Sequence, residues 1–362
     1  MNLNEKAILW LDIFQFLTLN KKVKILELFE QPKDIFTELK NKEKEILNIV
    51  NLDNLNEMLH YLKESIADRF LETLKNKNIG ALTYISEKYP SDFLNYENPP
   101  LVLYYKGNLN LINTKSVAVV GTRRVTRYGE RVTQMYCEEL VKNKVTIVSG
   151  MAEGVDTIAH KTALKHGGNT IAVLGCGFDQ IYPSSNIELF NEIAKCGLVL
   201  SEYSPITKAQ TYHFPQRNRI IVACSDAVLI TEAGIKSGAM HTKNYCLDYG
   251  KDLFVVPGNI DSEYSKGTNA VLKAMQGALT TSPEDILESL GVNQKHCFGK
   301  EEAKYQLSID EKLVIDIIGS DEVHFDEILN TLKLDTKTLL RLLTTLELNG
   351  IIKKLAGNYY SK

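Results

Sequence analysis

Six short apolar runs, each followed by a segment with helical periodicity, constrain the fold of this chain more than any other feature. The runs are rich in Val and Ile and nearly free of polar residues, which is typical of parallel strands covered on both faces. Repeated β–α units of this kind predict a doubly wound α/β sheet. The runs are VAVVG, TIVSG, TIAVLG, LVLSE, AVLITEA and LFVVPG, at 117–121, 146–150, 170–175, 198–202, 227–233 and 253–258.

The chain on either side of these units is helical in pattern, and its 362 residues suit two or three domains. We expect an N-terminal helical domain over 1–78, where Lys and Glu separate apolar residues at helical spacing. The alternating units fill a core over 79–290. After a polar linker, residues 305–362 read as three helices and a hairpin, which indicates a winged-helix-like domain. Those helices are expected at 308–318, 325–331 and 335–348.

The composition excludes several classes of protein. Hydrophobic residues make up 44% and charged residues 24% of the chain, which excludes disorder and collagen. The net charge of −3 excludes a chain-wide basic coat for nucleic acid but leaves a local basic groove open. No run approaches the roughly eighteen apolar residues of a membrane span. The N-terminus lacks a signal peptide's basic lead-in and cleavage site, and six Cys without a CxxC pair favour reduced thiols in a cytoplasmic protein.

The loops that follow the strands are where ligands are expected, because an open α/β sheet binds them outside the carboxyl ends of its strands. Small residues dominate these loops, and Gly lets backbone N–H groups approach an anion beside helix N-termini. Six such loops at one edge predict an extended phosphate-accepting crevice. The loops are 121–124, 149–156, 175–177, 201–203, 231–238 and 257–267.

The common nucleotide-binding motifs do not fit these loops. Gly121 is not followed by the rest of a GxGxxG motif, and Gln180 stands where the motif that begins with Gly175 and Gly177 needs its third Gly. No Gly-Lys-Ser/Thr follows a strand, so a Walker ATP site is excluded too. His and Cys have no ligand-like spacing. We therefore expect no cofactor and no metal.

Arginine gives a sharper signal than the glycines. Only eight of the 42 basic residues are Arg, and six of the eight lie in two short segments, 123–131 and 217–219. The planar guanidinium suits bidentate phosphate binding and stacking on bases. We expect the two segments to meet at the crevice and to hold phosphates there. An Arg that instead faces Glu202 or Glu232 would be structural.

No convincing catalytic constellation accompanies these cations, because GxSxG and HExxH are absent. Asp156 and His160 lie four residues apart on one helical face. They fit an acid–base pair or, as we favour, an Asp that caps a helix beside a packed His. Aromatic residues interleave with the basic ones, as single-stranded nucleic acid needs for stacking its bases, and we single out Phe214. The others are Tyr128, Tyr182, Tyr203, Tyr212 and Tyr264.

Five segments in succession resemble the DNA-processing protein A family, also called DprA or Smf. The resemblance covers about 80–290. It includes YPSDFLNYENPPLVLYYKGN at 89–108, which is similar to the segment that leads into the core domain of the family. The family's three-part layout then implies that the N-terminal domain is SAM-like. The segments are VAVVGTRRVTRYG, SGMAEGVDTIAHKTAL, GGNTIAVLGCGFDQIYPSSN, FPQRNRIIVACSDAVLITEAGIKSGA and VVPGNIDSEYSKGTNAVLKAMQGA.

The resemblance also implies which residues bind nucleic acid. The family's Gly-Ser/Thr-Arg, SGxAxGxD, FPxRNR and KSG motifs fall on the strand-exit loops and on one helix start. Met240, His241 and Thr231 depart from the usual pattern and leave the phosphate loops intact. The implied residues are Gly121, Thr122, Arg123, Ser149, Gly150, Ala152, Gly154, Asp156, Phe214, Arg217, Asn218, Arg219, Lys236, Ser237 and Gly238.

The function implied by the resemblance is binding of single-stranded DNA. Family members protect incoming DNA and load the RecA recombinase in natural transformation, from an extended Rossmann core that forms a homodimer. We accordingly expect a cytoplasmic protein that is not an enzyme. The C-terminal domain has 7 basic and 9 acidic residues over 305–362, which favours a protein-contact or weakly DNA-assisting role.

An alternative from another class is a Rossmann-like enzyme of the nucleoside monophosphate phosphoribohydrolase type. Such enzymes share a strand–Gly–helix phosphate loop. Their PGGxGTxxE segment is missing here, and Glu232 is the one comparable acid.

Overall fold

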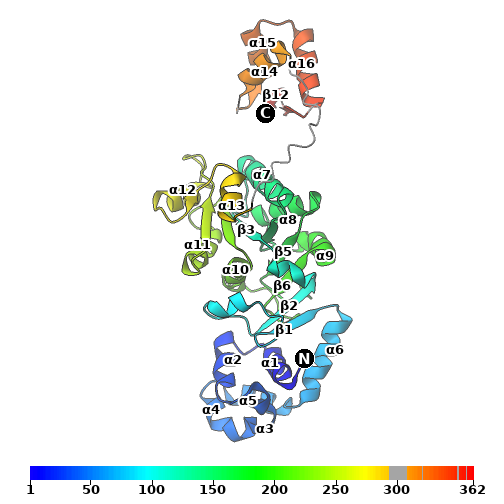
Figure 1. Ribbon diagram of the computed structural model, residues 1–362, viewed down its shortest axis with the longest axis vertical. Helices are drawn as coiled ribbons and strands as arrows, with labels where there is room; N and C mark the ends of the chain where they lie inside the picture. The colour runs from blue at the N-terminus through cyan, green and yellow to red at the C-terminus, as the bar shows by residue number, and fades with distance from the viewer. Residues whose placement is uncertain (293–307, 320, 349, 356) are drawn as a thin grey trace. The chain divides into compact units, whose positions relative to one another are not determined.

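The structure is a computed structural model that describes residues 1–292, 308–319, 321–348, 350–355 and 357–362 (Figure 1). The chain divides into two compact units, Met1–Gln294 and Lys295–Lys362. Most of the expected linker, and Cys297 with it, lies outside the described residues. Among the helices that the structure describes, none is long and apolar enough to cross a membrane.

A nine-stranded sheet forms the centre of the first unit, in the order β1-β2-β6-β5-β4-β3-β7-β8-β9. The strands from β6 to β9 in this order are parallel, whereas β2 joins β1 and β6 antiparallel. All six apolar runs are strands, β3 to β8, and the predicted doubly wound sheet is confirmed. The bounds are β1 (Gly80–Thr83), β2 (Val102–Gly107), β3 (Ser116–Val120), β4 (Thr146–Ser149), β5 (Thr170–Leu174), β6 (Leu198–Ser201), β7 (Ala227–Ile230), β8 (Asp252–Val255) and β9 (Ala278–Leu279).

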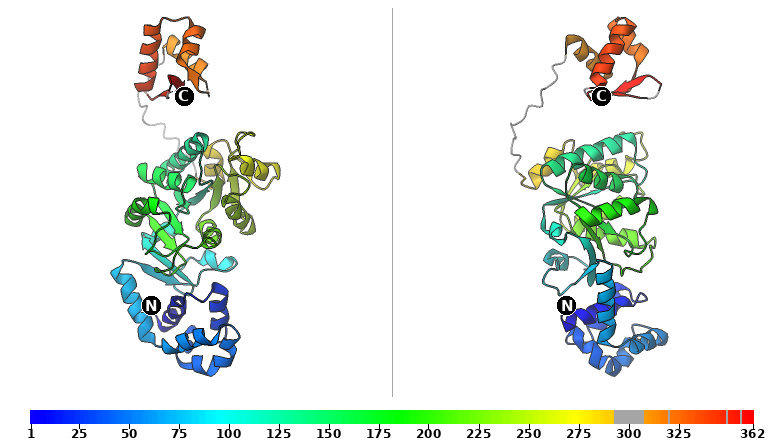
Figure 2. Two further views of the ribbon diagram at one scale, coloured as in Figure 1. Left: turned by 180° about the vertical axis from the view of Figure 1, so that it is seen from behind. Right: turned by 90° about the vertical axis from the view of Figure 1, so that its right-hand side faces the viewer.

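Helices cover both faces of this sheet, as Figure 2 shows. Val117 and Val119 of β3 pack with α7, α8 and α13, whereas Ala118 and Val120 pack with α10 and α11. The alternation follows from the two-residue period of a strand and explains why the runs contain almost no polar residue. The helices are α7 (Arg127–Lys142), α8 (Val155–Lys165), α9 (Ile187–Cys196), α10 (His213–Ala223), α11 (Ala239–Asp248), α12 (Lys266–Lys273) and α13 (Pro283–Ser289).

The N-terminal helices share a hydrophobic core with the sheet. Trp10 of the first helix is fully buried in a cluster that extends to Tyr104 of β2 and to α9. Asp12 joins the two parts, since its carboxylate accepts from Lys22 Nζ at 2.7 Å and from the Tyr104 hydroxyl at 2.6 Å. The expected boundary at residue 78 falls between α6 and β1. The helices are α1 (Leu3–Ile13), α2 (Leu19–Leu26), α3 (Ile35–Glu38), α4 (Glu43–Leu47), α5 (Leu52–His60) and α6 (Glu64–Asn76).

The second unit has the helices and hairpin of a winged helix. It contains α14 (Ile309–Ile318), β10 (Val323–His324), α15 (Phe325–Leu332), α16 (Thr336–Leu348), β11 (Lys353–Lys354) and β12 (Tyr359–Ser361). The three strands pair in the order β10-β12-β11. Buried apolar residues of all three helices, among them Val314, Ile328 and Leu343, form its core. The three helices predicted from the sequence are confirmed.

Charge is segregated along this winged helix. Residues 308–332 contain seven acids and one Lys, whereas residues 333–362 contain five Lys, one Arg and two acids. Lys337 and Arg341 are exposed one turn apart on α16, and Lys353 and Lys354 are exposed on β11. The net charge of −2 over residues 305–362 is therefore the sum of an acidic first half and a basic second half. The surface of α16 and the hairpin is basic.

Replacing Asp12 with Ala should lower the free energy of unfolding by about 3 kcal/mol, because the change leaves the Lys22 ammonium and the Tyr104 hydroxyl buried without their acceptor. Urea unfolding followed by the fluorescence of Trp10, the only Trp, measures the effect. Asp53→Ala removes an exposed acid on α5 and serves as the control. Equal stability of the two variants would contradict the role given to Asp12.

Candidate phosphate-binding pocket

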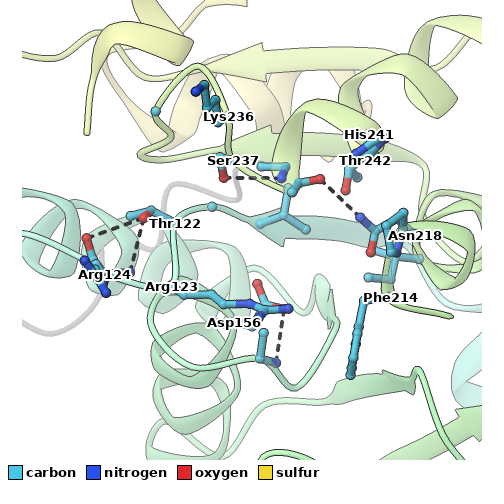
Figure 3. Close-up of a pocket in the computed structure, with 18 of the residues that line it drawn as sticks. Thr122, Arg123, Arg124, Asp156, Phe214, Asn218, Lys236, Ser237, His241 and Thr242 are labelled. Atoms are coloured by element: carbon cyan, nitrogen blue, oxygen red, sulfur yellow. Dashed lines mark hydrogen bonds between the residues drawn. The ribbon is translucent and has the colours of Figure 1, made fainter. Parts of the chain in front are cut away.

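A pocket of about 940 Å³ lies at the carboxyl ends of the strands (Figure 3). Strand order reverses between β3 and β7, so the crossovers on either side run in opposite directions and leave a crevice. Eleven of the fifteen expected site residues line it: Gly121, Thr122, Arg123, Ala152, Asp156, Phe214, Arg217, Asn218, Lys236, Ser237 and Gly238. Ser149, Gly150, Gly154 and Arg219 do not.

The loop between β3 and α7 presents two exposed cations to the pocket, Arg123 and Arg124. The Thr122 backbone N–H donates to the Glu232 carbonyl oxygen at 2.7 Å, and its hydroxyl accepts from the Arg124 N–H at 3.1 Å. These bonds fix the loop on both sides of Arg123. The Arg123 guanidinium carbon lies 5.5 Å from the centre of the Phe214 ring, a cation–π contact. Across the described part of the chain, Arg123 has no carboxylate within salt-bridge distance, so its charge is available to an anion.

Arg217 is a buried structural tie, although part of it lines the pocket. Its side chain is 3% exposed, and its guanidinium donates to the backbone carbonyls of Gly150 and Val173. Burial lowers its pKa, while the charge of Asp156 opposes that shift. Both bonds to the backbone carbonyls come from Nη1, and Nε donates to Asn218 Oδ1 at 3.2 Å, so the side chain joins the ends of β4 and β5 and fixes the pocket wall. Its expected phosphate contact stays a prediction.

Arg219 does not line the pocket, and its guanidinium is paired elsewhere in this structure. Its Nη2 donates to Glu202 Oε2 at 2.5 Å, and both side chains are about nine-tenths buried. This is the structural alternative that the sequence left open for an Arg facing Glu202. Ser149 is also turned away, because its hydroxyl donates to the Val119 carbonyl at 2.7 Å and thereby joins β4 to β3.

Two expected glycines shape the pocket from behind its lining. A Cβ on Gly150 would lie 2.5 Å from the Arg217 guanidinium. A Cβ on Gly154, whose φ is +79°, would lie 2.3 Å from the Thr122 carbonyl oxygen. Only glycine lets these loops approach Arg217 and the β3–α7 loop so closely.

Asp156 and His160 are structural and do not form an acid–base pair. Asp156 Oδ2 accepts from the backbone N–H groups of Gly150 and Ala152 at 3.2 and 3.3 Å, so it holds the loop before α8 and does not cap the helix. Burial raises its pKa, and the Arg217 charge opposes the shift. His160 is fully buried, with Nδ1 2.6 Å from the Thr170 hydroxyl.

The far side of the pocket is built from the loop after β7 and from α11. Lys236 is exposed at its rim, and Asn218 Nδ2 donates to the Gly238 carbonyl at 3.3 Å. Arg124, in the segment expected at the crevice, and Tyr264, one of the interleaved aromatics, line the pocket as well. Reasoning from the sequence did not place His241 and Thr242 there, because they enter only through the packing of α11 against α10. No signal in the sequence marks those two.

Glu232, the acid that the sequence marked for a catalytic alternative, lies outside the pocket lining. It is 1% exposed and accepts from the Thr126 N–H at 2.8 Å and hydroxyl at 2.6 Å, at the N-terminus of α7. Within the described ranges, no group of three metal-ligating side chains occurs. Glycine-rich loops, helix N-termini and an exposed guanidinium instead suit binding of an anion.

The fold and the pocket together define a Rossmann-type protein with a phosphate-accepting crevice at the switch point of its sheet. The chain belongs to the DNA recombination-mediator protein A family, whose model matches residues 80–291, and the model of the DprA winged helix domain matches residues 299–358. The resemblance read from the motifs is therefore confirmed.

Relatives and solved structures of the family agree with this assignment. DNA processing protein DprA of Bacillus subtilis is 37% identical over 224 residues, which are 61% of this chain and 75% of that protein. DprA of Streptococcus pneumoniae is 39% identical over 208 residues, 57% of this chain and 73% of the relative. The X-ray structure of the S. pneumoniae protein has a TM-score of 0.65 at 30% identity and covers 80% of this chain and 98% of that one.

A second solved structure concerns the single-stranded DNA binding mode of DNA processing protein A from Helicobacter pylori. It has a TM-score of 0.54 at 38% identity and covers 59% of this chain and 95% of that one.

The buried His160 should make stability fall in mild acid. Burial lowers its pKa from 6.5 to about 3, so below pH 6.5 the unfolded chain takes up a proton that the folded chain refuses. Its stability contribution is present above pH 6.5 and is lost as the pH falls towards 3. Between pH 7 and pH 4 the loss is about 3 kcal/mol.

Urea unfolding of the wild type and of His160→Gln at both pH values measures this contribution. The wild type should lose about 3 kcal/mol more than the variant. Parallel pH profiles of the two proteins would refute a neutral, buried His160.

Proposed function

We propose that this protein binds single-stranded DNA in the pocket at the β3–β7 switch point. The observation that carries the proposal is the placement of Arg123, exposed among glycine-rich loops and over the ring of Phe214. In this site a phosphate pairs with the guanidinium and with backbone N–H groups, and a base stacks on the ring. The H. pylori relative, which binds single-stranded DNA, supports the choice of ligand.

We propose further that the bound strand is incoming DNA in natural transformation, which the protein protects and onto which it loads RecA. Two observations support this. The family is described as a recombination mediator, and the pocket is an open crevice that suits a continuous strand whose remaining length stays accessible to a recombinase. Recombination of incoming DNA with the chromosome takes place in the cytoplasm, so the protein is proposed to act in the cytoplasm.

A homodimer is part of the same proposal. Met275, which precedes the edge strand β9 of the large sheet, is 93% exposed, and Leu279 of β9 is 57% exposed. Exposed apolar side chains next to an open strand edge suit burial against a second copy.

The proposed activity involves no catalysis. The phosphoribohydrolase alternative needs an acid beside the bound nucleotide, and Glu232, its one candidate, is buried at the start of α7. Release of free base from a nucleoside monophosphate by the wild-type protein would contradict this part of the proposal.

Arg123→Ala should weaken binding of single-stranded oligonucleotides of any sequence by tenfold or more, because it removes a phosphate contact and a stacking partner. The loss of one phosphate contact also makes the slope of log Kd against log salt shallower by about 0.7. Fluorescence anisotropy with labelled oligo-dT across a salt series measures both quantities.

The matched control for this variant is Arg131→Ala. It removes the same charge from an exposed position on α7 outside the pocket. Wild-type affinity in Arg123→Ala, or equal losses in the two variants, would remove the pocket from the DNA-binding surface.

RecA loading should follow from DNA binding at this pocket. On single strands coated with single-strand-binding protein, the wild-type protein should shorten the lag before RecA begins to hydrolyse ATP, and Arg123→Ala should shorten it much less. The control Arg131→Ala should behave as the wild type. An unchanged lag with the wild-type protein would contradict the loading role and leave DNA binding standing.

A further inference from the structure

Two exposed tyrosines flank the pocket without lining it. Tyr182 follows β5 and is 49% exposed, and Tyr212 directly precedes α10 and is 61% exposed. We call them the outer aromatic pair. Single exposed aromatic residues are common on protein surfaces and need no explanation. These two differ in that each rests against a ring at the start of α10, the helix that supplies Phe214.

The ring contacts connect the outer aromatic pair to the pocket. The Tyr182 ring centre lies 5.3 Å from that of Phe214, with the planes tilted by 47°. Phe214 in turn faces Arg123 inside the pocket. On the other side, Tyr212 meets His213 edge to face at 4.6 Å. His213 is stacked on Tyr203 at 4.0 Å.

Backbone geometry fixes the inner rings of this group. Phe214 packs so closely on Gly175 that a Cβ there would lie 2.8 Å from the ring. His213 is buried, with Tyr203 against its face. The outer tyrosines therefore lean on immobilised rings and keep part of their own surface exposed. A rigid, half-exposed ring is the form in which aromatic side chains stack on bases at low entropic cost.

The charges beside Tyr212 suit a polyanion. The loop between β6 and α10 carries Lys208, which is exposed and has no carboxylate partner in the described ranges. It also exposes the uncharged Gln210 and Thr211. Within the pocket, Arg123 and Phe214 lie close to one another (Figure 3). A DNA strand that leaves the pocket past Phe214 therefore passes aromatic rings close to a loop that carries Lys208. Residues 206–212 of that loop contain no acid.

We propose that Tyr182 and Tyr212 form a base-stacking subsite for the nucleotides on either side of the one held in the pocket. This proposal rests on single-stranded DNA binding at the pocket and adds how far the binding surface extends. The stacking tolerates any base, because every base has a π-face. The subsite thus lengthens the bound segment and does not select its sequence.

The test compares oligo-dT of increasing length, from a mononucleotide to about twelve nucleotides, with the full chain. On the mononucleotide, which fills the pocket and has no flanking base, Tyr182→Ala and Tyr212→Ala should bind as the wild type does. On the longer strands each should raise Kd by about fivefold or more, the effect expected when one base loses its aromatic partner. Tyr182→Phe and Tyr212→Phe keep the ring and should retain wild-type affinity at every length.

Two controls identify stacking as the cause. Tyr61→Ala removes a tyrosine of similar exposure, which meets His60 edge to face in the N-terminal helices, and should leave Kd unchanged. An oligonucleotide whose flanking positions are abasic keeps the phosphates and lacks the bases. On it, the Tyr→Ala variants should bind as tightly as the wild type.

The outcomes separate this inference from the function it rests on. If Arg123→Ala weakens binding at every length but the Tyr→Ala variants match Tyr61→Ala, the subsite is refuted and the pocket stands. If the Tyr→Ala losses persist on the abasic strand, base stacking is refuted. If Arg123→Ala has no effect at any length, the proposed function itself fails.

Discussion

The buried guanidinium of Arg217 is the interaction on which the geometry of the pocket depends. It reaches from α10 to the carbonyls of Gly150 and Val173, and so it joins a helix to the carboxyl ends of two neighbouring strands. A buried cation that is hydrogen-bonded to backbone carbonyls is costly to leave unpaired, which disfavours any movement that separates these three elements. Position 150 is a glycine because the Arg217 guanidinium occupies the space that a Cβ would fill.

Arginines that look equivalent in the sequence have different roles in the structure. Arg217 and Arg219 lie two residues apart on α10, and both are buried, one against carbonyls and the other against Glu202. Both guanidinium groups donate to other parts of the protein, whereas Arg123 stands in a loop and faces the pocket. The segment FPxRNR therefore shapes the wall of the pocket. The cations that face the proposed ligand come from the β3–α7 loop and from Lys236 at the rim.

The parts of this molecule that were predictable from the sequence are those set by local pattern. The strands β3 to β8 are buried on both faces and are long enough to show it, so their runs and the loops after them could be placed. The strands β1, β2 and β9 were not predicted from the sequence, because they are short or lie in the antiparallel, aromatic-rich margin of the sheet. The partner of Arg219 could not be chosen in advance, since Glu202 lies 17 positions earlier in sequence and meets it only through folding. His241 depends in the same way on α11 packing against α10.

Preorganisation explains how a chain with a net charge of −3 can hold a polyanion at this edge. Phe214 is set between Gly175 and Tyr182 before any ligand arrives, and the β3–α7 loop is fixed by the Thr122 and Glu232 bonds. Binding then has little to order apart from the Arg123 side chain, so few cations suffice and attraction need not come from the whole surface. Three acids near the site, Glu202, Glu232 and Asp156, are held in structural bonds, where they shape the loops. A fourth, Glu263, is exposed in the pocket lining and is paired with Lys266.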